Sequence, residues 1–314
     1  MIRFVRHQDI DPAKWDSTVL SSRFASRLAT FELLNTLTAD EGWDALIEDD
    51  YAAVLPLPHR IRWGVPYIYT PFFISGLGIF SPKTVDARKT STFFHAIPRK
   101  FRQVDLILNI ENDTSLLDTD ILQCVSHQLG LQQPYPTLFH SFSQNTKRNI
   151  RTAQRHSLSI TDNPDVLDYT ISLFRKYRGK SKAVNFRDRD YDTLRKTAVL
   201  LLKAGALDLR GALTPTGELA AGALFLKEPG RTLFWFSGRD GSLSAACPMF
   251  FILNEYIKEN AGENLILDFN GSSDENVARL YRSFGGTPYQ IPMIHHSVPW
   301  AGQCLVKLYR KLKG

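Results

Sequence analysis

The chain has 314 residues, of which 43% are hydrophobic and 22% are charged, and its formal net charge is +6. This composition excludes a disordered polypeptide. The length suits two domains that each bury a core. No stretch approaches the roughly 20 apolar residues of a membrane helix, and the N-terminus lacks the apolar run of a signal sequence, so we expect a cytoplasmic protein without a membrane span. The three cysteines lie far apart in no paired motif, which suits a reducing compartment and predicts neither disulfides nor a zinc site.

Helix and strand patterns alternate through the first half of the chain. Asp11-Pro12 is an N-cap followed by proline, which predicts a helix start, and short apolar or alternating runs indicate strands. In chain order we expect a helix from Pro12, a helix over 28–37, strands over 43–48, 51–57 and 67–69, a helix over 85–96, a strand over 104–110, a helix over 116–129 and an extended segment over 137–142.

The second half repeats this order of elements, although the two halves are not similar in sequence. The expected elements are helices over 144–155 (capped by Ser143), 164–175 and 191–203, strands over 206–213, 219–226 and 231–237, a helix over 248–259, a strand over 265–269, a helix over 275–284 and a final extended piece. A mixed, mostly antiparallel sheet flanked by helices fits each half. We therefore predict an α/β (α+β) protein of two tandem domains, 1–140 and 141–314.

Basic residues cluster at two places in the second half. Residues 171–203 contain ten Lys or Arg against three Asp. Lys147, Arg148 and Arg151 lie on the helix before them and share one side of it, because they are three and four residues apart. Such clusters favour an anionic partner, such as the phosphates of a coenzyme, a nucleotide-linked sugar or RNA, and a solvated helix face is the alternative.

The segment that follows the strand over 231–237 is a candidate anion site. A strand end and a polar loop lead into a helix with Pro248 in its first turn. Because a helix N-terminus exposes unpaired N–H groups and the positive end of the helix dipole, it can bind an anion. An ordinary strand-to-helix connection is the alternative. The candidate residues are Trp235, Phe236, Ser237, Gly238, Gly241 and Ser242.

Two later residues are candidates for chemistry. Asp268 interrupts an apolar strand, and a buried carboxylate is costly unless it is paired, so a base or substrate-holding role is as plausible as a capping or salt-bridging one. Tyr281 shares one helix face with Val277, Leu280 and Phe284. It is therefore either a core ring with its hydroxyl at the rim or a proton donor to a leaving group.

These residues carry a resemblance to a known family. The run containing Asn276, Ala278, Leu280, Tyr281, Phe284 and Gly285 resembles the last conserved helix of GNAT acyltransferases, in which the tyrosine often protonates the departing thiolate. More of the chain resembles the Fem-type branch, whose members are two GNAT-like domains in tandem. The matching segments are Ser143 with Lys147-Arg148-Asn149-Ile150-Arg151 and Ala153, Ala220 to Phe225, Ser237-Gly238, Pro248, Asp268-Phe269 with Gly271-Ser272, and Tyr67-x-Tyr69-x-Pro71.

The resemblance implies an N-acyltransferase that moves an acyl or aminoacyl group to an amine, which could be a small molecule or a cell-wall-precursor-like amine. It implies that Asp268 lies near the amine and that Tyr281 is the acid. The loop residues above and Asn276 would bind the donor. Tyr67, Tyr69, Lys147, Arg148 and Arg151 would bind substrates.

The donor is expected to be acyl-CoA or aminoacyl-tRNA. The GNAT phosphate loop has the pattern Arg/Gln-x-x-Gly-x-Gly/Ala, whereas this loop has no second glycine at that spacing; Fem-type ligases that use aminoacyl-tRNA also lack the pattern. A function from another class is a non-catalytic RNA- or anion-binding module on a degenerate GNAT fold. No metal is expected, because His295-His296 has no carboxylate or cysteine at ligand spacing.

Overall fold

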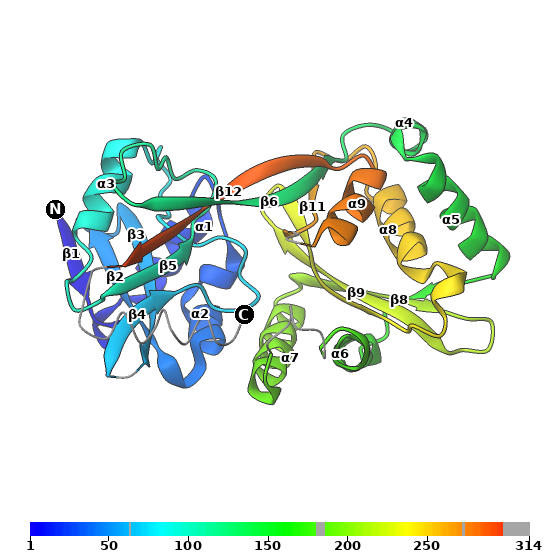
Figure 1. Ribbon diagram of the computed structural model, residues 1–314, viewed down its shortest axis with the longest axis horizontal. Coiled ribbons are helices and arrows are strands. Elements are labelled where there is room, and N and C mark those ends of the chain that lie inside the picture. Colours follow the sequence, from blue (N-terminus) through cyan, green and yellow to red (C-terminus); the bar gives the residue numbers. More distant parts are fainter. Residues whose placement is uncertain (63, 180–185, 272–273, 298–314) are drawn as a thin grey trace. The chain divides into compact units, whose positions relative to one another are not determined.

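The computed structural model describes residues 1–62, 64–179, 186–271 and 274–297 (Figure 1). The chain divides into two compact units. The first is Met1–Gln123 together with the segment from Ile291 onward, and the second is Cys124–Gln290. The division into domains at residue 140 that we predicted from the sequence concerns separately folding parts of the chain, and it stays a prediction that limited proteolysis would test.

The first unit is a mixed sheet with helices. Its strand order is β1-β2-β3-β4-β5-β12, and every described pairing is antiparallel except that of β4 with β5. Asp11 caps α1 by accepting from the N–H groups of Ala13 and Lys14. The elements are β1 (Ile2–Val5), α1 (Pro12–Ser21), α2 (Phe31–Thr38), β2 (Trp43–Glu48), β3 (Ala53–Arg62), β4 (Val65–Tyr69), α3 (Ala87–His95), β5 (Gln103–Ile107) and the later part of β12 (Thr287–Ser297).

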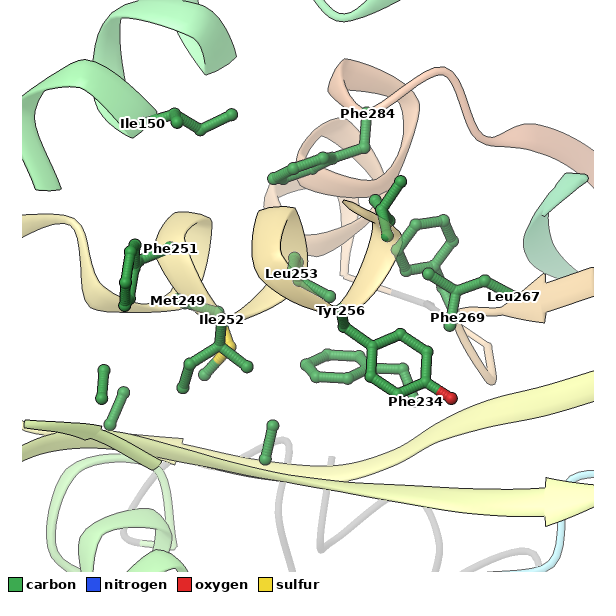
Figure 2. Packing of buried hydrophobic residues seen from close by; sticks show 14 of the residues in the cluster. Ile150, Phe234, Met249, Phe251, Ile252, Leu253, Tyr256, Leu267, Phe269 and Phe284 are labelled. Carbon is green, nitrogen blue, oxygen red and sulfur yellow. The ribbon is translucent and has the colours of Figure 1, made fainter. Parts of the chain in front are cut away.

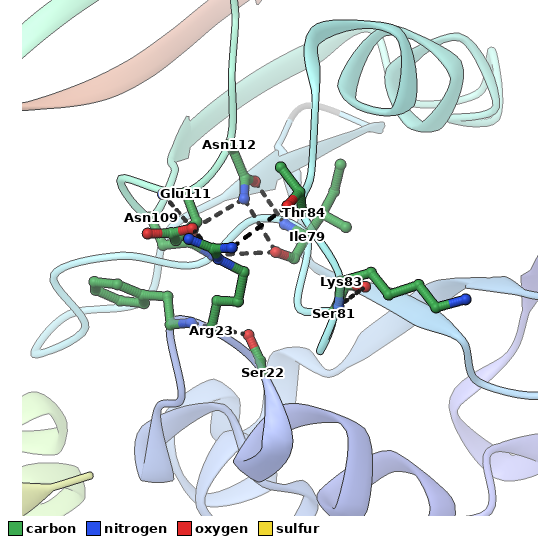
Figure 3. A network of polar contacts seen from close by, with 10 residues as sticks. Ser22, Arg23, Ile79, Ser81, Lys83, Thr84, Asn109, Glu111 and Asn112 are labelled. Carbon is green, nitrogen blue, oxygen red and sulfur yellow. Dashed lines mark hydrogen bonds and ion pairs between the residues drawn. The ribbon is translucent and has the colours of Figure 1, made fainter. Parts of the chain in front are cut away.

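Two asparagine side chains, those of Asn109 and Asn112, hold the loop before α3 by hydrogen bonds to the backbone of Ile79 (Figure 3). The Asn112 amide accepts from the Ile79 N–H at 2.7 Å and donates to the Ile79 carbonyl at 3.0 Å and to Asn109 Oδ1 at 2.9 Å. Gly78 has φ +97°, and a Cβ there would lie 2.3 Å from Asn112 Oδ1. The glycine is needed both for its backbone conformation and for this close approach.

The second unit has the strand order β6-β11-β10-β9-β8-β7, in which β10 and β11 are parallel and the other described pairs are antiparallel. Together with the first unit this confirms the predicted fold class. The elements are β6 (Asp120–Gly130), α4 (Tyr135–Ser141), α5 (Gln144–Arg155), β7 (Ser159–Thr161), α6 (Asp165–Tyr177), α7 (Asp188–Lys203), β8 (Leu207–Leu213), β9 (Leu219–Glu228), β10 (Arg231–Arg239), α8 (Pro248–Glu259), β11 (Ile266–Asp268) and α9 (Glu275–Ser283).

Helices cover both faces of this second sheet (Figure 1). The helices α5, α8 and α9 enclose the main core on one face, where Phe234, Ile252, Tyr256, Leu267 and Phe269 pack together (Figure 2). On the other face α6 packs on β9 and β10.

Two expected elements of this region are wrong. The segment 116–129, predicted as a helix, contains strand β6, and the segment 137–142, predicted as extended, lies largely in helix α4. The apolar spacing of 116–129 is compatible with a helix, but the backbone pairs instead with β11, where Leu129 lies opposite Leu267. In α4 two prolines occupy the N-terminal end, where they cost no intrahelical hydrogen bond.

Candidate functional site

A pocket of about 1290 Å³ lies in the second unit where β10 ends. Its walls are the C-terminal end of α6, the end of β10 with the following loop, the N-terminus of α8, and α9. Of the residues predicted to bind the donor or to act in catalysis, five line it: Ser237, Gly238, Gly241, Asn276 and Tyr281. The strand-to-helix segment that the sequence indicated as an anion site therefore forms part of the pocket wall.

A β-bulge shapes the strand at this pocket. Phe234 pairs with Phe225 and Phe236 with Leu224, so that Trp235 has no opposite residue in β9. The extra residue lets Phe234 face the core beside Tyr256 while Phe236 faces α6, where its ring lies 4.6 Å from that of Phe174. Within the described lining of the pocket Phe234 appears, whereas Trp235 and Phe236 do not.

The pairing of β10 with β11 ends before the bulge. It runs from Arg231 opposite Ile266 to Leu233 opposite Asp268. The next link between them is a side-chain contact, because the Asn270 amide donates to the Trp235 carbonyl at 3.4 Å. The strand ends therefore diverge directly beside the pocket.

Gly238 near the end of β10 and Gly241 in the loop after it allow α6 to approach closely. A Cβ on Gly238 would lie 2.3 Å from the Thr170 carbonyl oxygen, and one on Gly241 would lie 2.8 Å from the Tyr177 ring. Contacts shorter than 3 Å are not tolerated by real side chains. Gly238 and Gly241 thus line the pocket and also let α6 form its wall.

A carboxylate organises the same loop. Asp240 Oδ1 accepts from the Tyr177 hydroxyl at 2.8 Å and from the Ser242 N–H at 2.7 Å. The Ser242 hydroxyl also donates to this oxygen, and this bond is the largest cause that lowers the pKa of Asp240. The N–H of Ser242, a residue expected to bind the donor, is therefore already bonded to Asp240 within the loop. Ser242 also lies outside the described lining of the pocket.

The N-terminus of α8 opens into the pocket. Cys247, the residue before the helix, has the left-handed conformation (φ +53°), and in the described structure no side chain caps the helix start. Cys247, Pro248, Met249 and Phe250 line the pocket. Since the first N–H groups of a helix have no partner within the helix, this end can receive an anion.

Four arginines line the pocket, and one of them, Arg178, belongs to the basic cluster 171–203 noted in the sequence. They are Arg178, Arg239, Arg279 and Arg282. Arg178 pairs with Asp274 at 3.1 Å, and Arg282 forms an ion pair with Glu275. The signal was present in the chain, because Arg239 lies between the two loop glycines and the last two flank Tyr281.

The basic side chains predicted on α5 lie outside the described lining. The Lys147 ammonium donates to the His140 carbonyl at 2.8 Å, and the Arg148 guanidinium donates to Asn145 Oδ1 at 2.6 Å. Arg151 is exposed. Arg148 is nearest to the pocket, since Asn145 lines it and the charge of Arg148 acts on the Cys247 thiol, whose pKa burial raises.

Tyr281 is buried, with 6% exposure, yet it lines the pocket. Its ring stacks on that of Phe269, with a centroid distance of 4.5 Å, and has its edge toward Phe234 at 6.2 Å. Burial raises the pKa of its hydroxyl well above the ordinary value. The hydroxyl keeps its proton at neutral pH, as that of an ordinary tyrosine also does.

Asp268 lies on the other face of the sheet. Leu267 and Phe269 belong to the core beneath α8 and α9, so the alternating Asp268 points away from Tyr281. Its carboxylate accepts from the Tyr289 hydroxyl at 2.6 Å, the Ser126 hydroxyl at 3.1 Å and the Asn270 N–H at 2.8 Å.

Both oxygens of Asp268 are therefore already hydrogen-bonded. The Gly271 N–H also donates to the Ser126 hydroxyl at 2.7 Å, so the cluster shapes the turn that leaves β11. This geometry favours a structural role for the carboxylate over that of a base. Asp268 lies outside the described lining of the pocket.

Tyr67 and Tyr69 lie in the first unit, on β4. The Tyr69 hydroxyl donates to Glu41 at 3.1 Å, and the guanidinium of Arg60 lies 3.9 Å from the centroid of its ring. The two tyrosine rings are 6.1 Å apart. They are thus part of a polar group of their own.

The described residues contain no group of three or more His, Cys, Asp or Glu side chains placed to hold a metal ion. No helix among them combines the length and apolar character needed to cross a membrane.

Residues 140–279 match the model of the acetyltransferase (GNAT) domain family. This segment includes α5 to α8, the bulged strand β10 and most of the pocket lining. No curated protein sequence matches the chain.

Over its full length the chain has the tandem GNAT fold of the Fem type, which confirms the predicted resemblance. The crystal structure of FemX is similar with a TM-score of 0.65 at 12% identity, covering 98% of this chain and 99% of that one. A conserved protein of unknown function from Bacteroides thetaiotaomicron gives 0.62 at 12% identity, covering 95% and 100%. L-PGS from Bacillus licheniformis gives 0.55 at 12% identity, covering 97% of each chain.

Proposed function

We propose that this protein is an N-acyltransferase that transfers an aminoacyl group from aminoacyl-tRNA to an amine. The observation that carries the proposal is the pocket of the second unit, where an uncapped helix N-terminus, four arginines and a protonated tyrosine meet beside a bulged strand. Helix N-terminus and guanidinium groups together bind phosphates. A buried hydroxyl supplies a proton to a departing oxygen.

The loop geometry supports aminoacyl-tRNA over acyl-CoA as the donor. A pyrophosphate-binding loop needs free backbone N–H groups, whereas here Asp240 accepts the Ser242 N–H and adds a negative charge beside it. The ring of Tyr177 covers Gly241. Positive charge is supplied instead by long arginine side chains, which suit phosphates spread along a nucleic-acid strand. The Fem-type resemblance implies the same donor.

In the proposed reaction the neutral acceptor amine attacks the ester carbonyl of the donor. The C–N bond forms, the C–O bond to the terminal ribose breaks, and the amine loses one proton to solvent water, from which Tyr281 regains the proton that it donates. Tyr281 donates its proton to the departing ribose oxygen. We place the donor carbonyl against the backbone of 235–238, where Ser237 and Gly238 line the pocket as Asn276 does.

The remaining predicted residues have supporting roles in this proposal. Asp268 holds the residues directly after β11 through Ser126 and Asn270, and we propose that it thereby helps to position the helix that carries Tyr281. We propose that Arg148, with Lys147 and Arg151 behind it, extends the positive surface for the RNA. A cell-wall-precursor-like amine is the proposed acceptor, with Tyr67 and Tyr69 as its contacts.

The test is binding of a fluorescent tRNA acceptor-stem minihelix and of CoA, measured by anisotropy and competition at two salt concentrations. Arg239→Ala combined with Arg279→Ala should weaken minihelix binding about tenfold or more. Arg23→Ala is the matched control, because this arginine lies in the first unit, outside both basic clusters, and pairs with Glu111 at 2.8 Å.

Each alternative has its own result in this experiment. Binding of CoA but not of the minihelix would make acyl-CoA the donor and the tRNA proposal wrong. Minihelix binding that ignores the double variant would favour the non-catalytic RNA-binding module. Binding of neither would refute a phosphate-bearing donor in this pocket.

A further inference from the structure

The lining of the pocket in the second unit divides into an uncharged floor and a charged rim. We define the floor as the buried side chains of the lining, which are Leu173, Phe234, Pro248, Met249 and Tyr281. The four lining arginines are all exposed and form the rim. Buried and exposed parts of a pocket contact different parts of a ligand, so the floor and the rim bind chemically different groups of the donor.

The floor is part of the packed core of this unit. Phe234 and Met249 belong to the hydrophobic cluster beneath α8 (Figure 2), and Tyr281 packs on Phe269 in the same cluster. Further lining side chains are apolar and half-buried, namely Phe174, Phe250, Val277 and Leu280. The side chains of the floor therefore offer one polar group, the Tyr281 hydroxyl, on an otherwise apolar surface.

Negative charge is scarce along the lining. Of the described lining residues Asp274 alone has a carboxylate, and this residue is exposed and forms an ion pair with Arg178 at 3.1 Å. A cationic group in the floor would thus be buried without a counter-ion, in a pocket whose rim carries four guanidinium groups. Burial of an unpaired charge is strongly unfavourable.

The reacting ester determines how the donor is oriented. The proposed reaction has the departing ribose oxygen at the Tyr281 hydroxyl and the carbonyl at Ser237 and Gly238. The phosphates of the nucleic acid bind to the arginines of the rim, because guanidinium groups form charge-assisted hydrogen bonds with phosphate. The aminoacyl side chain lies on the other side of the carbonyl from the ribose, so it contacts the floor.

We propose that the floor binds the side chain of the transferred aminoacyl group and selects apolar side chains against polar and cationic ones. The inference rests on the proposed function, in which this pocket holds the donor. An apolar side chain gains its transfer free energy on burial in the floor. An amide or ammonium group loses its hydration there and gains no partner, since the ribose oxygen engages the one hydroxyl. The α-amino group is common to all aminoacyl donors and does not distinguish them.

The experiment compares the binding of four tRNA acceptor-stem minihelices by anisotropy. Each ends in a 3′-aminoacylamino-3′-deoxyadenosine, whose amide bond resists transfer, and the amino acids are leucine, asparagine, lysine and glycine. Leucine and asparagine side chains have nearly the same shape, so size does not account for a difference between them. We expect the leucyl form to bind about tenfold or more tightly than the glycyl form, and the asparaginyl and lysyl forms no more tightly than the glycyl form.

Met249→Gln tests the floor itself, because glutamine keeps the length of the side chain and adds an amide. It should lower the leucyl preference about tenfold and leave the affinity of the glycyl form unchanged. Met293→Gln is the matched control, since this methionine lies on β12 in the first unit, outside the described lining. If Met249→Gln does not fold, as its melting temperature shows, Val277→Thr decides. Val277 is half-buried, and the loss of one methyl group there should lower the preference about threefold.

Equal binding of the leucyl, asparaginyl and lysyl forms overturns the inference, and so does a leucyl preference that persists in the folded variant. The uncharged minihelix, measured in parallel, tests the proposed donor by itself, so binding of all forms alike contradicts this inference alone. If CoA binds and the minihelix does not, the proposed donor is wrong. Isovaleryl-CoA should then bind about tenfold more tightly than acetyl-CoA, and equal affinities overturn the inference. Binding of neither carrier overturns both proposals.

Discussion

Replacing Tyr281 by phenylalanine separates its chemical role from its packing role. The substitution keeps the ring on Phe269, 4.5 Å between centroids, and removes only the oxygen. A neutral hydrogen bond contributes about 1 kcal/mol, so the free energy of unfolding should fall by at most about that amount. If the hydroxyl protonates the leaving oxygen, turnover should fall roughly a hundredfold or more.

The assay is single-turnover transfer from a charged minihelix, with urea unfolding measured on the same sample. Tyr256→Phe is the matched control, because this tyrosine is also buried, at 2% exposure, and stacks on Phe225 at 3.8 Å but lies outside the described pocket lining. It should lose stability without losing turnover. Tyr281→Ala would be uninformative, since the cavity alone could cost about 3–5 kcal/mol.

Full turnover in Tyr281→Phe would refute the general-acid role, and the departing oxygen would then have to take its proton from elsewhere. Equal losses of turnover in the Tyr281 and Tyr256 variants would show that packing, not the hydroxyl, accounts for the effect. Neither result would change the fold.

Two further predictions concern stability. Gly238→Ala should lower the free energy of unfolding by about 1–3 kcal/mol, because its Cβ would lie 2.3 Å from the Thr170 carbonyl oxygen. Gly76→Ala is the control and should cost less, since its Cβ would have no neighbour closer than 3.4 Å. Equal urea midpoints for the two variants would contradict this prediction. Burial raises the pKa of Tyr256 to about 12, while the unfolded chain releases this proton near pH 10. The contribution of this protonated hydroxyl to the free energy of unfolding is complete below pH 10 and is lost as the pH rises toward 12. Tyr256→Phe should therefore reduce the fall of the urea midpoint between pH 10 and 12. A fall as steep as that of the natural chain would contradict this prediction.

Elements with strong local signals could be predicted from the sequence. The helix over 144–155 begins after Ser143, whose hydroxyl accepts from the Thr146 N–H at 3.1 Å, and the helix over 248–259 begins at Pro248. Both have the predicted bounds because capping residues and proline act within one turn of the chain.

The polar contacts around the candidate site could not be predicted in this way. Asp268 was equally compatible with a base and with a paired carboxylate, because its partners Ser126 and Tyr289 lie 142 and 21 residues away.

By itself the sequence determined the alternation of helices and strands, the strand-to-helix loop at Gly238 and the tyrosine helix, because each depends on spacing within a few residues. Only the tertiary structure decided that 116–129 contains a strand, whose end at Gln128–Gly130 pairs with β11. It likewise decided which face of the sheet Asp268 occupies and which arginines surround the pocket. Those features follow from contacts between segments far apart in the chain, where local propensity has no influence.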